Sequence, residues 1–242
     1  MKKFGLIGKT LNHSFSKTFF NDFFSKEKVD ASYENFPLNS ISEIKSLFQK
    51  EKLDGINVTI PYKEEVIPYL DELTLDAKAI GAVNVISFEN GKTIGHNTDA
   101  FGFHQSIKPF LTNKHERALI LGTGGASKAV ASVFKSLGID VIYASRTPKG
   151  TNQFEYNQIN EYMIRACKVI INCTPIGTFP MIDETISIPF EELTEHHLVI
   201  DLIYNPEKTK FLKLAEENKA TILNGYSMLQ QQALKAWEIW NK

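Results

Sequence analysis

Short apolar runs alternate with helical patterns of apolar residues along the whole chain. In the first half, runs rich in β-branched and aromatic residues predict strands over 3–7, 31–36 and 55–59. Between the first two, phenylalanine recurs at the spacing of one helix face, at positions 15, 19, 20, 23 and 24. This Phe stripe is typical of core packing, and the alternation of elements predicts an α/β fold with mostly parallel sheets.

Local signals add a helix and a hairpin to the first half. A helix is predicted over 41–50, with Ser40 or Ser42 as its cap. A hairpin is predicted over 83–95, because Asn90-Gly91 favours a type I′ turn.

A second series of elements follows a change of pattern near residues 99–110. Strands are predicted over 117–121, 141–145, 169–172, 198–202 and 221–223, and helices over 126–137, 209–218 and 228–240. The polar stretch 149–157 has the weakest pattern. A chain of 242 residues corresponds to one or two domains, and the change of pattern indicates two.

Composition narrows the class of protein. Hydrophobic residues make up 43% and charged residues 23%, which is typical of a globular protein with a substantial core. The net charge of −1 gives no basic excess, so neither nucleic acid nor an anionic membrane is an expected partner. No apolar run approaches the ~20 residues of a membrane-spanning helix, and the N-terminus resembles a first strand rather than a signal peptide.

The cysteines and histidines give no sign of a disulfide or a metal site. Cys167 and Cys173 flank a predicted strand that would hold them ~20 Å apart, beyond disulfide reach. Two separated thiols predict a reduced, cytoplasmic protein. No Cys-x-x-Cys or helical His-x-x-x-His spacing is present, so no metal is expected.

A glycine-rich turn joins the predicted strand 117–121 to the helix that follows. Gly122 permits the tight turn, Gly124 lets a pyrophosphate approach the backbone, and the small residues Gly125-Ala126-Ser127 allow close packing of the helix. Free N–H groups at that helix start favour bound phosphate. The pattern departs from G-x-G-x-x-G because Ser127 stands at the third glycine. It predicts dinucleotide binding, with a purely structural turn as the alternative.

The end of the next strand indicates which dinucleotide. NAD sites commonly carry an acidic residue there, ~20 residues after the motif. Here the strand ends in Ser145-Arg146-Thr147, with Lys149 close behind. A guanidinium at this point suits the 2′-phosphate of NADP. NADP is therefore favoured; a solvated arginine and use of NAD stay open.

Four polar clusters stand at the ends of elements in the first hundred residues, at 12–16, 57–63, 81–84 and 96–99. Such hydroxyls and amides at strand ends can hold a polyhydroxylated substrate. Each has a structural alternative: Ser14 and Ser16 as helix caps, Asn84 as turn chemistry, and Asp99 as a cap.

Together the motifs resemble one family. The order Ser-x-Ser, Asn-Val-Thr-x-Pro-x-Lys, Gly-Ala-Val-Asn, Asn-Thr-Asp, Gly-Thr-Gly-Gly-Ala, Asn-x-Thr-Pro-x-Gly and Asn-Gly-x-x-Met-Leu-x-x-Gln is similar to that of the shikimate/quinate dehydrogenases, over residues 5–237. The resemblance implies an N-terminal α/β substrate domain, a Rossmann-like doubly wound NADP-binding domain, and a C-terminal helix returning to the substrate domain. Its boundaries would be 1–100 with 225–242, and 101–224.

The implied activity is that of an oxidoreductase. It is the reversible, NADPH-dependent reduction of 3-dehydroshikimate to shikimate, within chorismate and aromatic amino-acid biosynthesis. Lys63 would donate and accept the proton, and Asp99 would position Lys63 and bind a substrate hydroxyl. The protein would be a monomer or homodimer acting on a small molecule.

The same resemblance assigns binding residues. Ser14 and Ser16 would hold the substrate carboxylate. Other substrate contacts would come from Thr59, Asn84, Tyr204 and Gln232. Cofactor contacts would come from Gly122, Thr123, Gly124, Gly125, Ala126, Ser145, Arg146, Thr147, Thr174, Leu202 and Gly225.

Three departures from the family pattern stand out. Lys17 replaces a frequent proline, so the first helix can start differently. Ser145 replaces a frequent asparagine, which weakens one contact near the adenine. The segment 146–169 is short for a strand–helix unit, which puts Lys149 in doubt as a second 2′-phosphate ligand.

Three other functions are weighed against this one. A quinate-using relative would tend to have threonine at Ser16. A methylenetetrahydrofolate dehydrogenase, with a similar two-domain plan, would lack the Ser14/Ser16 pair. A binding module that has lost its chemistry would lack Lys63 or Asp99, and this chain has both.

Overall fold

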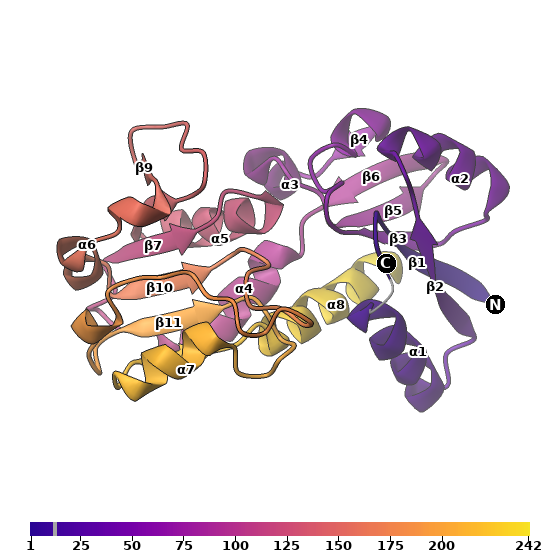
Figure 1. Ribbon diagram of the computed structural model, residues 1–242. Coiled ribbons are helices and arrows are strands. Elements are labelled where there is room, and N and C mark those ends of the chain that lie inside the picture. Colours follow the sequence, from indigo (N-terminus) through magenta and orange to yellow (C-terminus); the bar gives the residue numbers. More distant parts are fainter. Residues whose placement is uncertain (12–13) are drawn as a thin grey trace. The chain divides into compact units, whose positions relative to one another are not determined.

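The computed structural model describes residues 1–11 and 14–242 (Figure 1). Asn12 and His13, from the first polar cluster, lie outside the described residues. The chain forms two compact units: unit 1 comprises Met1–Thr98 and Ala233–Lys242, and unit 2 comprises Asp99–Gln232. The division falls inside the last helix, α8 (Tyr226–Trp240).

Unit 1 contains a mixed six-stranded sheet in the order β2-β1-β3-β5-β6-β4. The strands are β1 (Lys2–Gly8), β2 (Ala31–Pro37), β3 (Gly55–Val58), β4 (Glu72–Leu73), β5 (Val85–Glu89) and β6 (Lys92–His96). β1 runs parallel to β2 and β3, whereas β5 is antiparallel to both β3 and β6. Asn90 and Gly91 have φ values of 52° and 78°, the positive values that the predicted type I′ hairpin requires.

Helices cover both faces of this sheet. They are α1 (Phe15–Glu27), α2 (Ile44–Lys50), α3 (Leu75–Ile80) and the end of α8, with 3₁₀ turns η1 (Ile41–Glu43) and η2 (Ile67–Tyr69). On one face Phe20 and Phe24 of α1 pack with Phe4 and with Trp240 of α8. The Phe stripe is therefore core, as predicted. Ser40 caps η1, which runs directly into α2.

Unit 2 is built on a six-stranded sheet whose strands are all parallel, in the order β12-β11-β10-β7-β8-β9. The strands are β7 (Arg117–Leu121), β8 (Asp140–Ala144), β9 (Gln153–Phe154), β10 (Val169–Asn172), β11 (Leu198–Asp201) and β12 (Thr221–Leu223). Numbered within the unit from β7, this is the order 3-2-1-4-5-6 of the doubly wound Rossmann fold. The predicted fold class is confirmed.

Successive residues of each strand alternate between two cores, one on each face of the sheet. Ala118 and Ile120 face a core shared with α4 (Asp99–Ile107), α5 (Gly125–Ser136) and the start of α8. Leu119 and Leu121 face the core of α6 (Glu161–Ala166) and α7 (Lys210–Glu217). Burial on both faces explains why these strands appear in the sequence as continuous apolar runs.

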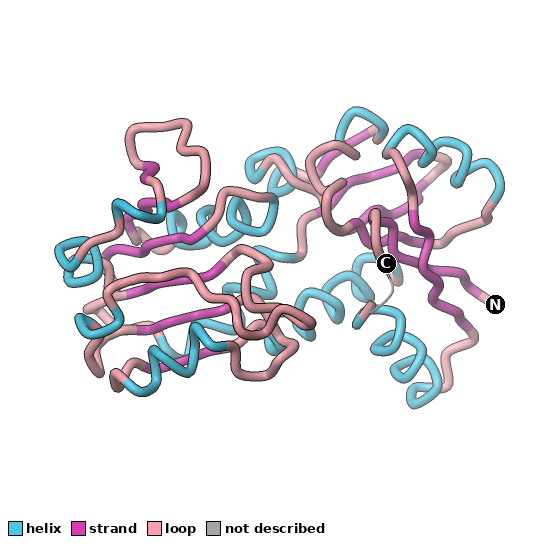
Figure 2. The backbone as a smooth tube through the Cα atoms, viewed as in Figure 1, coloured by secondary structure: helices cyan, strands magenta, loops and turns pink. Residues whose placement is uncertain are grey.

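Two connections in unit 2 are abbreviated. The segment 146–169 keeps a strand and a helix in short form, since β9 has two residues and α6 has six. The connection from β10 to β11 is mostly loop (Figure 2), with only the 3₁₀ turn η5 (Phe190–Glu192) in it.

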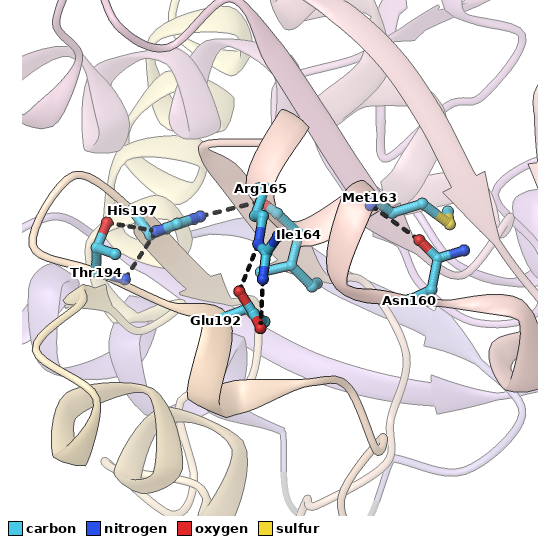
Figure 3. A network of polar contacts seen from close by, with 7 residues as sticks. All are labelled: Asn160, Met163, Ile164, Arg165, Glu192, Thr194 and His197. Atoms are coloured by element: carbon cyan, nitrogen blue, oxygen red, sulfur yellow. Dashed lines mark hydrogen bonds and ion pairs between the residues drawn. The ribbon is translucent and has the colours of Figure 1, made fainter.

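Side-chain contacts fix that loop against α6 (Figure 3). The Arg165 guanidinium donates two hydrogen bonds to the Glu192 carboxylate, one from Nε at 2.6 Å and one from Nη2 at 2.9 Å. The Nδ1 atom of His197 accepts a hydrogen bond from the Thr194 N–H at 2.9 Å, and its Nε2 donates to the Ile164 carbonyl at 3.0 Å. Both ring nitrogens of His197 are thus used to hold the fold.

Within residues 1–11 and 14–242, no helix is both long and apolar enough to cross a bilayer. Cys167 and Cys173 are free thiols at either end of β10.

Candidate active site

Three of the polar clusters come together in unit 1 through hydrogen bonds to main-chain carbonyls. The Val83 N–H donates to the Lys63 carbonyl at 2.7 Å, which joins cluster 81–84 to cluster 57–63. The Asn97 side chain donates to the Ala82 carbonyl at 2.9 Å, which joins cluster 96–99 to both. Lys63 lies half-buried on the turn after β3. The fold therefore gathers segments that are widely separated in sequence around one lysine.

Asn84 is the buried link within this group, with 2% of its surface exposed. Its Oδ1 accepts from the Thr98 N–H at 2.7 Å, and its Nδ2 donates to the Thr98 hydroxyl at 2.9 Å. Asp99 follows directly as the first residue of α4 and is 4% exposed. The Asn84 amide thus bridges two segments and fixes the backbone that leads into Asp99.

The end of β1 positions Thr59 and the turn that begins there. The Thr59 N–H donates to the Ile7 carbonyl at 2.9 Å, and the Tyr62 N–H donates to the Thr59 carbonyl at 2.9 Å. A Cβ on Gly8 would lie 2.6 Å from the Thr59 methyl group. Glycine at position 8 therefore lets Thr59 approach β1 this closely.

The two serines of the first cluster have different surroundings. Ser14 caps α1 by accepting a hydrogen bond from the Lys17 N–H at 3.2 Å, so the capping alternative holds for Ser14. Capping uses an oxygen lone pair and leaves the hydroxyl hydrogen for an anion. A proline at position 17 would lack the N–H that makes this bond. Ser16 lies in the first turn of α1 and is half-buried.

In unit 2, Gln232 of α8 lies beside the first turns of α4. A Cβ on Gly102 would come within 2.9 Å of the Gln232 Cβ, so glycine allows the two helices to pack this closely. Gln232 is 7% exposed, and its amide donates to the Leu229 carbonyl at 3.1 Å. Because Gly102 is one turn beyond Asp99, the helix pair brings Gln232 into the neighbourhood of Asp99.

The predicted cofactor residues follow the carboxyl ends of five parallel strands, which is where doubly wound folds bind ligands. They follow β7 (Gly122, Thr123, Gly124, Gly125 and Ala126), β8 (Ser145, Arg146 and Thr147), β10 (Thr174), β11 (Leu202) and β12 (Gly225). The sheet therefore gathers all of them at one edge.

Two glycines of the glycine-rich turn differ in why they are needed. The fold requires glycine at position 122 but not at position 124. Gly122 has a φ of +104°, and a Cβ there would lie 2.9 Å from the Thr174 methyl group. At Gly124, by contrast, an added Cβ would meet no atom within 4 Å. Gly124 caps α5 without a side-chain hydrogen bond, and the first turn of α5 holds no acidic residue. This open helix start fits the pyrophosphate of a dinucleotide.

The end of β8 also fits NADP. The Ser145 hydroxyl is buried and has no hydrogen-bond partner among the described residues, although its N–H donates to the Phe154 carbonyl at 2.9 Å. Arg146 is exposed, and its guanidinium opposes the rise in pKa that burial causes at Tyr156. Thr147 and Lys149 are exposed as well. A solvent-accessible cation beside an unsatisfied hydroxyl suits a phosphorylated ribose.

Leu202 and Gly225 are in direct contact. A Cβ on Gly225 would overlap the Leu202 carbonyl, and the Gly225 N–H donates to the Ile203 carbonyl at 3.1 Å. Tyr204 is half-buried on the same turn after β11. Only glycine can bring these two strand ends this close.

The sequence analysis missed a buried network that fixes the loops after β10 and β11. Asp201 accepts hydrogen bonds from the Asn172 amide at 3.1 Å, the Ile203 N–H at 3.0 Å and the Thr209 hydroxyl at 2.6 Å. Asn172 in turn accepts from the Thr174 hydroxyl at 2.7 Å. Burial raises the pKa of Asp201 to about 6, and these hydrogen bonds oppose the rise. The signal in the sequence was a polar residue ending each of two apolar strands.

Across residues 1–11 and 14–242, no three His, Cys, Asp or Glu side chains gather in a way that could hold a metal ion.

Comparison with known proteins places these features in a family. The family model described as the shikimate dehydrogenase substrate binding domain matches residues 6–86. A shikimate dehydrogenase (NADP(+)) of Clostridium beijerinckii is 36% identical over 253 residues, which cover all of this chain and 93% of the relative.

Solved structures of shikimate dehydrogenases match this chain over nearly its full length. The crystal structure of shikimate dehydrogenase from Aquifex aeolicus matches with a TM-score of 0.89 at 36% identity, covering 100% of this chain and 92% of that one. The shikimate 5-dehydrogenase of Thermus thermophilus, in complex with NADP(H) and shikimate, matches with a TM-score of 0.86 at 28% identity, covering 99% and 93%.

Proposed function

The chain belongs to the shikimate dehydrogenase family, and on this basis we propose that it catalyses the reversible, NADP-dependent oxidation of shikimate to 3-dehydroshikimate. This reaction serves chorismate and aromatic amino-acid biosynthesis. Most of the proposed substrate-binding residues lie in unit 1, and all of the proposed cofactor-binding residues lie in unit 2. The observation that carries the proposal is the convergence of three polar clusters at Lys63, because it gathers a cation, amides and hydroxyls where a polyhydroxylated acid needs them.

Lys63 handles the proton of the reaction. Bound NADP⁺ would supply the hydride acceptor for the carbinol carbon of shikimate, and NADPH would supply the hydride in the reverse direction. During oxidation the Lys63 amine takes the proton from the hydroxyl oxygen; during reduction the ammonium returns it as negative charge develops on that oxygen. The Asp99 carboxylate positions Lys63 and accepts a hydrogen bond from a substrate hydroxyl.

Hydroxyl and amide groups orient the substrate. Ser14 and Ser16 donate hydrogen bonds to its carboxylate, and this requires no formal positive charge. Ring hydroxyls and the carboxylate receive further contacts from Thr59, Asn84, Tyr204 and Gln232. A site built to pair such groups discriminates against analogues that lack them, because its own buried polar atoms would then be left unpaired.

The cofactor lies along the strand ends of unit 2. Its pyrophosphate would be held at the start of α5 by Gly122, Thr123, Gly124, Gly125 and Ala126. Arg146 would hold the 2′-phosphate, with Ser145 and Thr147 beside it. Thr174 would hold the ribose or pyrophosphate, and Leu202 and Gly225 would border the nicotinamide. The exposed guanidinium of Arg146 supports NADP over NAD.

We further propose that the protein acts in the cytoplasm as a monomer or homodimer. The two free cysteines support a reducing compartment. Light scattering of the purified protein measures its mass directly, and a mass above two chains would contradict this.

The activity is tested with purified protein, shikimate, and either NADP⁺ or NAD⁺, by following the absorbance of the reduced nicotinamide. We expect turnover with NADP⁺ and weak turnover with quinate. The Lys63→Ala variant should lose about 10²- to 10⁴-fold in kcat, because it lacks the group that transfers the proton. Lys52→Ala, at an exposed lysine of the same unit, is the matched control and should retain activity.

Folded protein that turns over shikimate with neither cofactor would contradict the proposal. Faster reaction with NAD⁺ than with NADP⁺ would leave the reaction standing and remove the 2′-phosphate role of Arg146.

A further inference from the structure

Asn172, the last residue of β10, holds Thr174, a residue of the proposed cofactor site. The Asn172 side chain is buried, with 1% of its surface exposed. Its Oδ1 accepts hydrogen bonds from the Thr174 N–H at 2.9 Å and from the Thr174 hydroxyl at 2.7 Å. One amide oxygen therefore fixes both the backbone and the side chain of Thr174.

The orientation of the Asn172 amide follows from its other partners. A carbonyl oxygen only accepts hydrogen bonds, so the Nδ2 atom must face the Ile176 carbonyl, at 3.3 Å. The same Nδ2 donates to the Asp201 carboxylate at 3.1 Å. The Oδ1 atom then faces Thr174. Because an amide oxygen cannot donate, the Thr174 hydroxyl is the donor in the bond that it shares with Asn172.

This bond leaves the Thr174 hydroxyl able to accept but not to donate. A hydroxyl group has one hydrogen and two lone pairs, and the hydrogen is used on Asn172. In the part of the chain that the structure describes, the Thr174 oxygen accepts one hydrogen bond, from the Ile176 N–H at 3.2 Å, so one lone pair stays open. Thr174 is only half-buried, so part of its surface is open to a ligand. A ribose hydroxyl can donate to that lone pair, whereas a pyrophosphate oxygen has no hydrogen to donate.

The order of the strands indicates which ribose. The proposed pyrophosphate contacts follow β7 and the proposed nicotinamide contacts follow β11 and β12, and β10 lies between β7 and β11. Main-chain hydrogen bonds join the end of β10 to both neighbours: the Cys173 N–H donates to the Leu121 carbonyl at 2.8 Å, and the Leu202 N–H donates to the Asn172 carbonyl at 3.0 Å. In NADP the group between the pyrophosphate and the nicotinamide is the nicotinamide ribose. The position of Thr174 in the sheet therefore fits that ribose.

We propose that Asn172 is a positioning residue for the cofactor, because it fixes the Thr174 hydroxyl as an acceptor for a hydroxyl group of the nicotinamide ribose. This inference rests on the proposed function, in which Thr174 belongs to the cofactor site. It decides between the two contacts considered for Thr174, in favour of the ribose and against the pyrophosphate. Asp201 contributes by holding the Asn172 amide in the orientation that this contact requires.

Calorimetric binding of two ligands to Thr174→Val tests the assignment. NADPH carries the nicotinamide ribose, whereas 2′-phosphoadenosine 5′-diphosphate carries the 2′-phosphate and the pyrophosphate but no second ribose. Valine keeps the shape of threonine and removes the hydroxyl, so the Kd for NADPH should rise about fivefold, as for one lost neutral hydrogen bond. The Kd for the diphosphate should stay within about twofold. A rise in both dissociation constants, or in neither, would overturn the proposal.

Thr178→Val is the matched control, and Thr174→Ser is the conservative variant. Thr178 lies in the same loop, and its hydroxyl donates to the Asn205 carbonyl at 3.3 Å. Thr178→Val should leave the Kd of both ligands within about twofold. Thr174→Ser keeps a hydroxyl and should recover most of the NADPH affinity that Thr174→Val loses. Equal losses in Thr174→Val and Thr178→Val would indicate a general effect on the loop and would overturn the proposal.

A double-mutant cycle shows whether Asn172 acts through Thr174. Asn172→Ala releases the Thr174 hydroxyl, so the Kd for NADPH should again rise while binding of the diphosphate does not weaken. Adding Thr174→Val to Asn172→Ala should then cause little further loss of NADPH affinity. Independent, multiplying increases in Kd would overturn the proposal.

Analogues of NADPH keep the test decisive if Asn172→Ala fails to fold. Fluorine in place of the 2′- or 3′-hydroxyl of the nicotinamide ribose cannot donate a hydrogen bond. Wild type should bind one of these two analogues about fivefold more weakly than NADPH, and the difference should vanish in Thr174→Val. A difference that persists in Thr174→Val, or equal binding of NADPH and both analogues by wild type, would overturn the proposal.

The failure of this inference is distinguishable from the failure of the proposed function. Absence of shikimate turnover by folded wild type with either NADP⁺ or NAD⁺ would indicate failure of the proposed function. Normal wild-type turnover with NADP⁺, together with variants that bind NADPH and the diphosphate in unchanged proportion, would overturn this inference alone.

Discussion

The two units stabilise their strand ends with buried hydrogen-bond networks that differ in charge. The network of unit 1 consists of the neutral side chains of Tyr33, Asn57, Asn84 and Thr98. The network of unit 2 consists of Thr174, Asn172, Asp201 and Thr209, and Asp201 brings a carboxyl group that is fully buried. Both networks link residues of different strands and the loops beside them.

This difference in charge determines how each network responds to pH. A neutral network keeps its hydrogen bonds across the physiological pH range, because none of its groups titrates there. A buried carboxyl group can accept three hydrogen bonds when ionised, but burial disfavours the charge. We therefore expect pH to act on the loops of the cofactor unit through Asp201 and to leave the neutral hydrogen bonds of the unit 1 network unaffected.

The largest expected effect is a pH-dependent stability of unit 2. Burial raises the pKa of Asp201 from 3.8 to about 6, so between these values the folded state binds a proton more readily than the unfolded state. The Asp201 contribution to the free energy of unfolding should therefore fall by about 3 kcal/mol as pH rises from about 3 to 7. Hydrogen exchange of β10 and β11 measures this loss.

Asp201→Asn isolates the effect of the carboxyl group. Asparagine cannot titrate. The fall in the free energy of unfolding between pH 4 and 6 that Asp201 causes should therefore appear in the wild type and be absent from the variant. Equal slopes in the two proteins would contradict a raised pKa at Asp201, whatever the absolute loss of stability.

A smaller loss is expected in unit 1 from Asn84→Ala. The buried N–H and hydroxyl of Thr98 would lose their partners, which should cost about 2 kcal/mol. Urea unfolding should report the same loss at pH 5 and pH 8. Asn241→Ala, which removes an exposed amide contact in the same unit, should cost less than about 0.5 kcal/mol. A loss that changed with pH would break the contrast between the units.

The smallest effect concerns cofactor choice rather than stability. Arg146→Ala should raise the KM for NADP⁺ about tenfold and leave the KM for NAD⁺ nearly unchanged, because only NADP⁺ carries the 2′-phosphate. Unfolding should be unaffected, since Arg146 is exposed. The Lys149→Ala variant, at the nearby exposed lysine, shows whether Arg146 alone lowers the KM for NADP⁺ or whether Lys149 contributes as well. Equal increases for both cofactors would rule out the assigned contact.

Strong local signals made most of the fold predictable. The strands of both sheets, the Phe-rich helix and the Asn-Gly hairpin were confirmed because their periodicity or turn chemistry is encoded within a few residues. The strand over 198–202 was predicted one residue long at its end, since Leu202 continues the apolar run beyond the last ladder pair.

Short elements were not predicted. β4 and β9 have two residues each, and α3 and α6 have six. Segments of this length carry too little periodicity to be recognised, and they form because the neighbouring sheet supplies their hydrogen-bond partners. Tyr33 was missed for a related reason: its pattern is that of a core residue, and only the fold brings its hydroxyl to Asn57.

By itself, the sequence determined the α/β class, the glycine-rich turn before a helix, and the motifs that identify the family. These depend on local periodicity, on backbone conformations open to glycine, and on the order of residues along the chain. The tertiary structure decided which polar residues meet: Lys63 with Val83, Asn84 with Thr98, and Asp201 with Thr209. Hydrogen bonds act over about 3 Å, so partners far apart in sequence are fixed only when strand order and register bring them together.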